Sequence, residues 1–406
     1  MQKHDDIVGE GPDLWSPPAT ETLRTLPVAF SGSGSEYFRI WIVNLLLVLL
    51  TLTLYWPFAR ARRLAYFQNN TLVGGDPLGF HADPWTMFRG HLVVLALGIG
   101  YWTVSRFAPE AGWMALLAVA VLWPLLWRAS LQFRLRNTSW RGVRMEFAGD
   151  TRGAYAVLLP FFLPALALAL LIPSEVQPEP GSAARWGVLG AAGLSLLTVL
   201  ATPWLLMRLK RYQHGGYVFT QQRLRLEASA MDLYALHFKT ALVSLASMLL
   251  TAGLVFALMV LVLGLGQSEV LDTMRRPGVA AGGVLAVVAL GIALLYLMIP
   301  LVALPYFTAR FQNLLWSGSR SALVRFESRL RFRDLARVNA LNWLLMVPTL
   351  GLYWPFAKVN IARLKLQALS VHVAGPVDDW VAQGQSGPSG VLGDAAGDFL
   401  GIDMGL

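Results

Sequence analysis

The feature that most constrains this chain is a set of six apolar segments that are almost free of charge. Arg106, close to one end, is their single Lys, Arg, Asp or Glu residue, and the segments are 92–107, 111–127, 154–173, 186–207, 240–265 and 279–307. About 20 apolar residues in a helix cross a hydrocarbon layer of ~30 Å, so each segment is a candidate membrane span. The composition of the 406-residue chain agrees, with 55% hydrophobic and 14% charged residues.

A second constraint is a stretch that occurs twice, at 44–60 and at 342–358. Aligned without gaps, the copies share Asn, Thr and the run Tyr-Trp-Pro-Phe-Ala, followed by Arg60 or Lys358. The apolar segments around them, 40–58 and 338–356, have turn-permissive centres. These two segments predict one of two arrangements. Either they form short re-entrant hairpins, whose irregular backbone at membrane depth must be covered by protein, or they are two further spans, which makes eight in all.

Basic residues are strongly biased to one side of the predicted spans. Of 33 Lys and Arg residues, four lie at the presumed outer turns, which leaves 29 (33 − 4) on or near the other side. This bias is the positive-inside pattern. It predicts a multi-pass protein of the bacterial cytoplasmic (inner) membrane with its basic loops in the cytoplasm.

The loops between the predicted spans carry a weaker repeat of an Arg, a polar residue, a Gly and a Phe. Alternating stretches such as 143–147 and 217–220 predict short, β-hairpin-like cytoplasmic loops. We therefore expect an all-α polytopic transmembrane protein with internal repeats. Its expected parts are a polar N-terminal lead (1–36), a transmembrane domain (37–374) and a flexible acidic C-terminal tail (375–406).

The N-terminal third resembles the YjgN family of bacterial inner-membrane proteins, a family of unknown function. The matching residues are Gly32 to Phe38, Asn44, Tyr55 to Arg60, Asn70 to Gly74 and Phe80. One departure is Thr53, where we expect the family to favour Gly, as in Thr349-Leu350-Gly351 of the second copy. The resemblance implies a membrane location and no particular activity.

The sequence offers little that resembles catalytic chemistry. Cysteine is absent, and the six histidines show no spacing typical of a metal site. We expect a non-enzymatic protein without a cofactor. Because the basic residues lie beside apolar segments, we expect membrane lipids as partners and no nucleic acid.

Two sets of residues are candidates for a binding role. The first is the repeated polar pair inside the apolar stretches, which either satisfies backbone groups or lines a site between the copies. Its members are Asn44, Thr51, Asn342 and Thr349. The second consists of candidate lipid-headgroup contacts, namely Arg60, Arg62, Arg63, Arg134, Arg136, Arg208 and Arg211.

These patterns favour a membrane scaffold or lipid-interacting module as the function. The alternative is a transporter or channel with a pathway between the repeats. The C-terminal tail, which carries several apolar residues among its aspartates, is either disordered or a docking segment for a protein partner.

Overall fold

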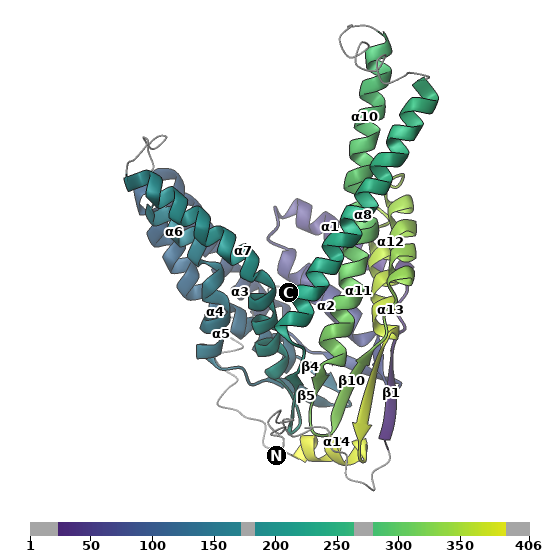
Figure 1. The fold of residues 1–406 in the computed structure, drawn as a ribbon. Coiled ribbons are helices and arrows are strands. Elements are labelled where there is room, and N and C mark those ends of the chain that lie inside the picture. Colours follow the sequence, from purple (N-terminus) through teal and green to yellow (C-terminus); the bar gives the residue numbers. More distant parts are fainter. Residues whose placement is uncertain (1–22, 172–182, 264–278, 387–406) are drawn as a thin grey trace, which may run out of the picture.

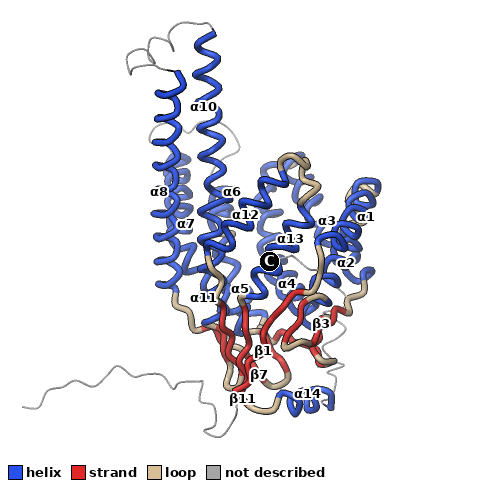
Figure 2. Tube along the Cα trace, turned by 90° about the vertical axis from the view of Figure 1, so that its right-hand side faces the viewer, coloured by secondary structure: helices blue, strands red, loops and turns tan. Residues whose placement is uncertain are grey.

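The computed structural model describes residues 23–171, 183–263 and 279–386, and this part of the chain is mostly helical (Figures 1 and 2). The α-helices are α1 (Gly34–Leu50), α2 (Trp56–Asn69), α3 (Pro84–Phe107), α4 (Gly112–Arg136), α5 (Thr151–Leu158), α6 (Leu163–Leu171), α7 (Ala183–Gly215), α8 (Ala230–Leu263), α10 (Val279–Met298), α11 (Leu304–Ser317), α12 (Phe332–Met346), α13 (Trp354–Gln367) and α14 (Val377–Ser386). Two 3-10 turns, η1 (Pro109–Ala111) and η2 (Leu159–Phe161), and a π-helical turn, η3 (Ile299–Ala303), connect some of them.

In the described part of the chain, eleven short strands form one antiparallel sheet at one end of the helices. They are β1 (Leu23–Phe30), β2 (Thr71–Val73), β3 (Asp76–Phe80), β4 (Thr138–Trp140), β5 (Val143–Phe147), β6 (Tyr217–Phe219), β7 (Gln222–Arg223), β8 (Arg225–Leu226), β9 (Ser319–Arg320), β10 (Val324–Ser328) and β11 (Leu369–Ala374). Their order is β7-β6-β5-β4-β3-β2-β1-β11-β10-β9-β8. Only Leu224 separates β7 from β8 in the chain, so one continuous segment joins the two edges of the sheet. We call this closed arrangement the strand ring.

The strand ring repeats one local unit. A strand ends at Phe30, Phe80, Phe147, Leu226 and Ser328, and in each case a helix begins four residues later. Several of these helices are capped in the same way, with Ser33, Asp83 and Asp150 accepting hydrogen bonds from backbone N–H groups of the first turn. Such caps stabilise a helix N-terminus by about 1 kcal/mol each.

Five helical hairpins stand on the strand ring and also close into a ring. They are α1–α2, α3–α4, α5/α6–α7, α8–α10/α11 and α12–α13, and each contacts the next, with α13 contacting α1. Each seam between neighbours has its own buried apolar cluster, represented in order by Phe133, Trp127, Met207, Ala309 and Tyr37. In Figure 1 the longer helices form two groups that diverge away from the strands.

The interior of the strand ring is filled by side chains. Leu26, Val28, Trp140, Val371 and Val373 are buried in one cluster, and apolar residues of most other strands pack against it. α14 lies beyond the strands (Figure 2), and its Val377 belongs to the same cluster. The strand ring is therefore a packed core.

The expectation of a mostly helical chain with several candidate spans is confirmed. Within the described ranges, five helices are long and apolar enough to cross a membrane, or six if the pair 151–161 and 163–170, bent by 55°, is one span. Many large apolar side chains of these helices face outward, for example Leu250, which is 76% exposed. The all-α class is incomplete, however, because the expected separate strand loops pair into a single sheet.

Both copies of the repeated stretch reverse direction halfway. In the first copy α1 and α2 are antiparallel around a turn at 51–55, and in the second α12 and α13 are antiparallel around 347–353. Leu52 and Thr53 have φ of +47° and +74°, and the aligned Leu350 and Gly351 have +49° and +87°. Each copy is therefore a helical hairpin, and its re-entry into the membrane stays a prediction.

Parts of the predicted lead and tail belong to the folded structure. β1, within the lead, pairs with β2 and β11, and α14, within the tail, is held by an ion pair from Arg141 to Asp378 of 2.7 Å. Residues 1–22 and 387–406 lie outside the described residues. A protein partner for the tail stays a prediction.

Candidate functional site

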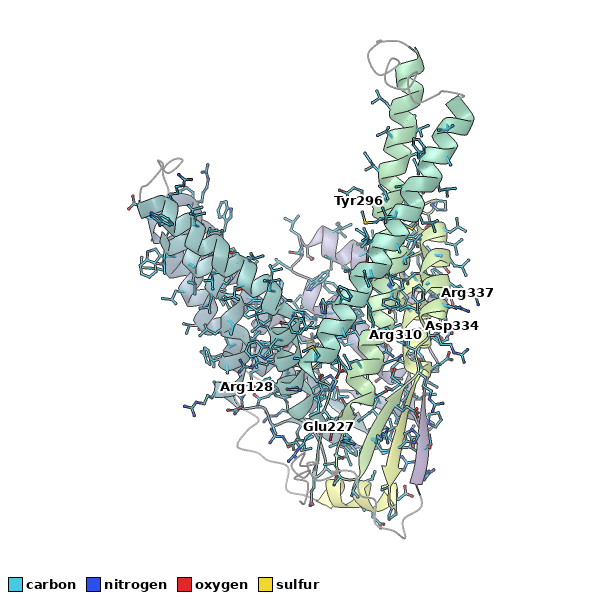
Figure 3. All side chains as sticks on the ribbon, viewed as in Figure 1. Arg128, Glu227, Tyr296, Arg310, Asp334 and Arg337 are labelled. Carbon is cyan, nitrogen blue, oxygen red and sulfur yellow. The ribbon has the colours of Figure 1, made fainter. Side chains whose placement is uncertain are left out.

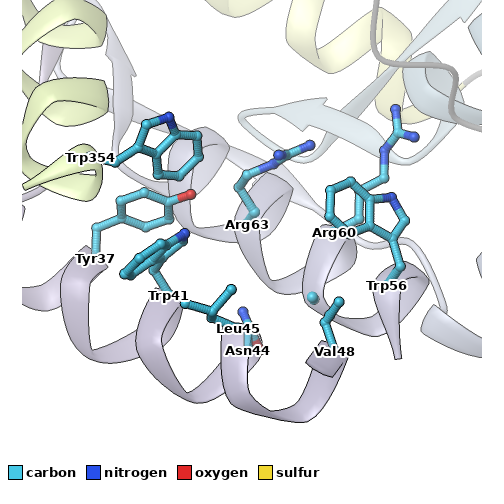
Figure 4. Close-up of a pocket in the computed structure, with 10 residues that line it drawn as sticks. Tyr37, Trp41, Asn44, Leu45, Val48, Trp56, Arg60, Arg63 and Trp354 are labelled. Carbon is cyan, nitrogen blue, oxygen red and sulfur yellow. The ribbon is translucent and has the colours of Figure 1, made fainter. Parts of the chain in front are cut away.

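A pocket of about 100 Å³ lies where the first helical hairpin meets α13. Its lining residues are Tyr37, Trp41, Asn44, Leu45 and Val48 from α1, Trp56, Ala59, Arg60 and Arg63 from α2, and Trp354 from α13. Figure 4 shows Tyr37, Trp41 and Trp354 at one end, Trp56 and Arg60 at the other, and Arg63 between them.

Local sequence signals set the helices that form this pocket. Ser33 and Glu36 make a capping box, in which each side chain bonds to the other residue's backbone N–H, and this starts α1. Tyr66 of α2 donates to the carbonyl oxygen of Ser33 at 2.8 Å and so fixes the two helices against each other. Pro57 starts α2 in its first turn, where a proline removes no helical hydrogen bond.

The two copies of the repeat meet at this pocket. Trp56 and Arg60 of the first copy align with Trp354 and Lys358 of the second. Trp354 lines the pocket, and the Lys358 ammonium lies 5.1 Å from the centre of its ring. The first copy therefore contributes Trp56 and Arg60 to the pocket lining, and the second contributes Trp354, with Lys358 against the Trp354 ring.

The pocket is electrostatically positive. None of its ten lining residues, all within the described chain, is acidic, whereas two are arginines. Burial raises the pKa of Tyr37 to about 12, and the positive charge of Arg63 opposes this rise. Tyr37 is therefore a neutral hydrogen-bonding group at physiological pH, and the net charge of the lining comes from Arg60 and Arg63.

The predicted polar pair acts mainly within each hairpin. Asn44 is buried and its Oδ1 lies 3.5 Å from the Arg62 guanidinium, while Asn342 accepts from Asn360 at 3.3 Å. Thr51 and Thr349 each bond to a carbonyl four residues earlier, and each accepts from the backbone N–H of the tyrosine four residues later. Of these four residues, Asn44 lines the pocket. Their proposed binding role stays a prediction.

The seven predicted headgroup arginines lie in different surroundings. Arg60 and Arg63 line the pocket, and Arg62 faces Asn44 and the Tyr55 ring. Arg208 lies 4.8 Å from the centre of the Trp204 ring, and Arg211 donates to the carbonyl oxygen of Ala228. Arg134 and Arg136 lie in the last turn of α4. Sequence reasoning did not include Lys358, although its place in the repeat was a usable signal.

Polar groups elsewhere on the strand side are engaged with one another. His81 lies 2.8 Å from the Ser139 hydroxyl, and Glu227 forms an ion pair with Arg320. Among the described residues, no group of three or more His, Asp or Glu side chains is arranged to hold a metal ion. Arg128 and Glu227 lie near the strands, whereas Tyr296 lies far along α10 (Figure 3).

These features define a helical membrane protein with several candidate spans and a basic, tryptophan-rich pocket between two short hairpins. Residues 25–399 match the family described as bacterial protein of unknown function (DUF898), and the chain belongs to that family.

Its relatives carry the name inner membrane protein YjgN, which confirms the resemblance found in the sequence. The YjgN of Salmonella typhimurium (strain LT2) is 24% identical over 373 residues, which cover 86% of this chain and 89% of the relative. The YjgN proteins of Escherichia coli O157:H7 and K12 are 32% and 31% identical over 138 residues. In these two matches the chain spans about a third of the relative's length, 34%. No solved structure matches the chain.

Proposed function

We propose that this protein is a non-enzymatic, lipid-interacting protein of the cytoplasmic membrane that binds an anionic phospholipid headgroup in the pocket between α1, α2 and α13. The observation that carries the proposal is that Trp56 and Arg60 of one copy and Trp354 of the other line one pocket, whose ten lining residues include two arginines and no acid. The relatives are named inner membrane proteins, which supports the location.

The proposed topology has six spans and two short hairpins, with the strand ring in the cytoplasm. In the sequence, 29 of 33 basic residues lie outside the presumed outer turns, and this bias supports the orientation. The hairpin tips are apolar, since Leu52 is 84% and Leu350 94% exposed. Exposed leucines at a tip are favourable in lipid, so both hairpins re-enter the membrane from the cytoplasmic side.

The lining suits the parts of a phospholipid at the membrane boundary. A guanidinium group binds phosphate oxygens through two parallel N–H donors. Arg60 and Arg63 each bring one such group to the pocket, from adjacent turns of α2. Indole rings favour the headgroup layer, and Trp41, Trp56 and Trp354 surround the same space. Leu45 and Val48 continue the lining along α1, where they can contact the start of an acyl chain.

The alternative of a transport pathway along the ring axis has less support. Such a pathway would pass through the strand ring, which is filled by the cluster around Trp140 and Val371. A pathway between the repeats would also use Asn342, which is 3% exposed and bonded within its own hairpin.

The test is a lipid titration of the purified protein in zwitterionic micelles, with bound phosphatidylglycerol counted by native mass spectrometry. A juxtamembrane cation contributes about 1 kcal/mol to anionic lipid binding. The double variant Arg60→Gln/Arg63→Gln is therefore expected to bind about 30-fold more weakly than wild type, since ~1.4 kcal/mol is tenfold.

The matched control is Arg208→Gln, which removes an arginine of α7 that stacks on Trp204 and does not line the pocket. It is expected to leave the affinity within about twofold of wild type, because its loss removes only diffuse surface charge. If Arg208→Gln weakens binding as much as the double variant does, headgroup attraction is general and the pocket is not the binding site.

A further inference from the structure

One of the five seams in the helical ring differs from the other four. Four connections carry the chain from one hairpin to the next, through two strands at 70–83, 137–150 and 318–331 and through three strands at 216–229. The remaining seam joins α13 to α1, and its strand pair is β11 with β1, from opposite ends of the chain. We call it the closure seam. Because no peptide connection crosses it, only noncovalent contacts close the ring there.

The contacts across the closure seam are largely aromatic. Trp354 lies 5.9 Å from Trp41 and 6.4 Å from Tyr37 between ring centres, and Phe356 lies 5.7 Å from Phe38. Arg363 of α13 also donates to the carbonyl oxygen of Gly32 at 2.8 Å. Several of these aromatic residues line the pocket, so the pocket is part of the closure seam.

Two like charges lie on opposite sides of the same seam. Arg63 stands on α2 and Lys358 on α13, and Lys358 covers the Trp354 ring that lines the pocket. The pKa of Lys358 is lowered mainly by partial burial and, to a smaller extent, by the positive charge of Arg63. The two cations therefore repel each other when the seam is closed, and an anion between them replaces repulsion by two attractive contacts.

We infer that a phosphate-bearing anionic headgroup in the pocket is the ligand that holds the ring closed at the α13–α1 seam. This inference rests on the proposed function. A ligand that binds the closed seam and not the open one shifts the opening equilibrium by the factor 1 + [L]/Kd. Headgroup binding and seam closure are then reciprocally linked.

The test is hydrogen–deuterium exchange of the full chain in lipid nanodiscs. The reporters are Leu23–Phe30 and Leu369–Ala374 at the closure seam, and the internal reference is 138–147, whose strands belong to one continuous unit. Replacing part of the phosphatidylcholine by phosphatidylglycerol, to about ten times its Kd, is expected to slow seam exchange roughly tenfold. Exchange at the reference is expected to stay unchanged.

Two variants separate the seam charge from general effects. Lys358→Gln removes the cross-seam repulsion, so exchange in phosphatidylcholine alone should slow and the increment from phosphatidylglycerol should shrink. Arg310→Gln removes a cation of α11 that lies over the Tyr306 ring and does not line the pocket, and it should behave as wild type.

The outcomes distinguish the two proposals. In one outcome, phosphatidylglycerol binds and the binding depends on Arg60 and Arg63, but it slows hydrogen exchange equally at the seam strands and at the reference strands. The closure inference then fails and the binding site stands. If no specific binding occurs, both fail. Equal protection by inorganic phosphate in phosphatidylcholine discs would assign the site to a free anion and overturn the assignment to lipid.

Discussion

At the scale of single residues, the repeat is informative where its two copies differ. Thr53 and Gly351 occupy the same place in the two hairpin turns, and both have a left-handed backbone, with φ of +74° and +87°. Glycine adopts this conformation without strain, whereas a β-branched residue pays for its Cβ contacts. Leu52 and Leu350 are left-handed to the same extent, so the difference lies at Thr53 and the first turn is the more strained of the two.

Exchanging these residues should move stability in opposite directions. Gly351→Thr is expected to lower the free energy of unfolding by about 1–2 kcal/mol, the usual cost of a left-handed conformation for an L-residue. Thr53→Gly removes that cost but adds backbone entropy to the unfolded chain, so it should raise stability by a smaller amount, about 0.5 kcal/mol. Thermal unfolding in detergent checks both, and a neutral Gly351→Thr would show that the turn relaxes around a side chain.

Only some features of the pocket could be predicted from the sequence. The types of residue in its lining could be predicted, because Trp beside Arg at the end of an apolar stretch is typical of the membrane boundary. Arg60 and Arg63 were accordingly among the predicted headgroup contacts. That Arg60 and Arg63 share one pocket with Trp354 could not be predicted, because this depends on a contact between α1 and α13, which lie at opposite ends of the chain.

At the scale of elements, small and hydroxylated residues let the long helices pack. Ser195, Thr198, Thr240 and Ser244 each donate to the carbonyl four residues earlier, so their hydroxyls need no partner on another helix. Gly291 of α10 lies so close to α8 that an added Cβ would be 2.9 Å from the Val255 side chain. Close approach of this kind drives helix association in lipid.

Gly291→Leu should therefore separate α8 from α10. Overpacking of this size costs typically about 1–3 kcal/mol, and we expect a lower unfolding temperature in detergent. The matched control is Gly253→Leu on α8, where an added Cβ has no neighbour within 4 Å among the described residues. The prediction is wrong if the two variants lose the same stability, since the effect would then come from the leucine itself.

The long helices were predictable and the strands were not. Within the described residues, each of the six apolar segments lies in one helix or in consecutive helices, because length and hydropathy identify a candidate span without long-range information. The bend between α5 and α6 occurs around Pro160 and Pro164, which interrupt helical hydrogen bonding. Strands of two to five residues, such as β7 and β9, carry too little pattern to predict their neighbours.

At the scale of the whole molecule, the ring is closed by pairing between the two ends of the chain. β1 and β11 pair in a register that sets Thr25 opposite His372, 347 residues away. Contacts this far apart leave no local trace in a single sequence, so the closed order could not be predicted from it. Closing so long a loop also costs entropy, which makes this seam the weakest place to hold the ring together.

A disulfide across that register should test closure directly. The chain has no cysteine, so Thr25→Cys/His372→Cys introduces a single pair, and oxidation in detergent should crosslink it readily because the two positions face each other. In the chain-entropy account a loop of this length yields up to roughly 5 kcal/mol, although engineered crosslinks often give less. We expect a higher unfolding temperature after oxidation than after reduction. Phosphatidylglycerol should then add less stability to the oxidised form than to the reduced form, because closure no longer depends on the ligand.

The matched control is Thr25→Cys/Ser370→Cys, which sets the second cysteine two residues out of register. Equal crosslinking of both pairs would mean that β1 slides on β11, and the ring would then be open for part of the time.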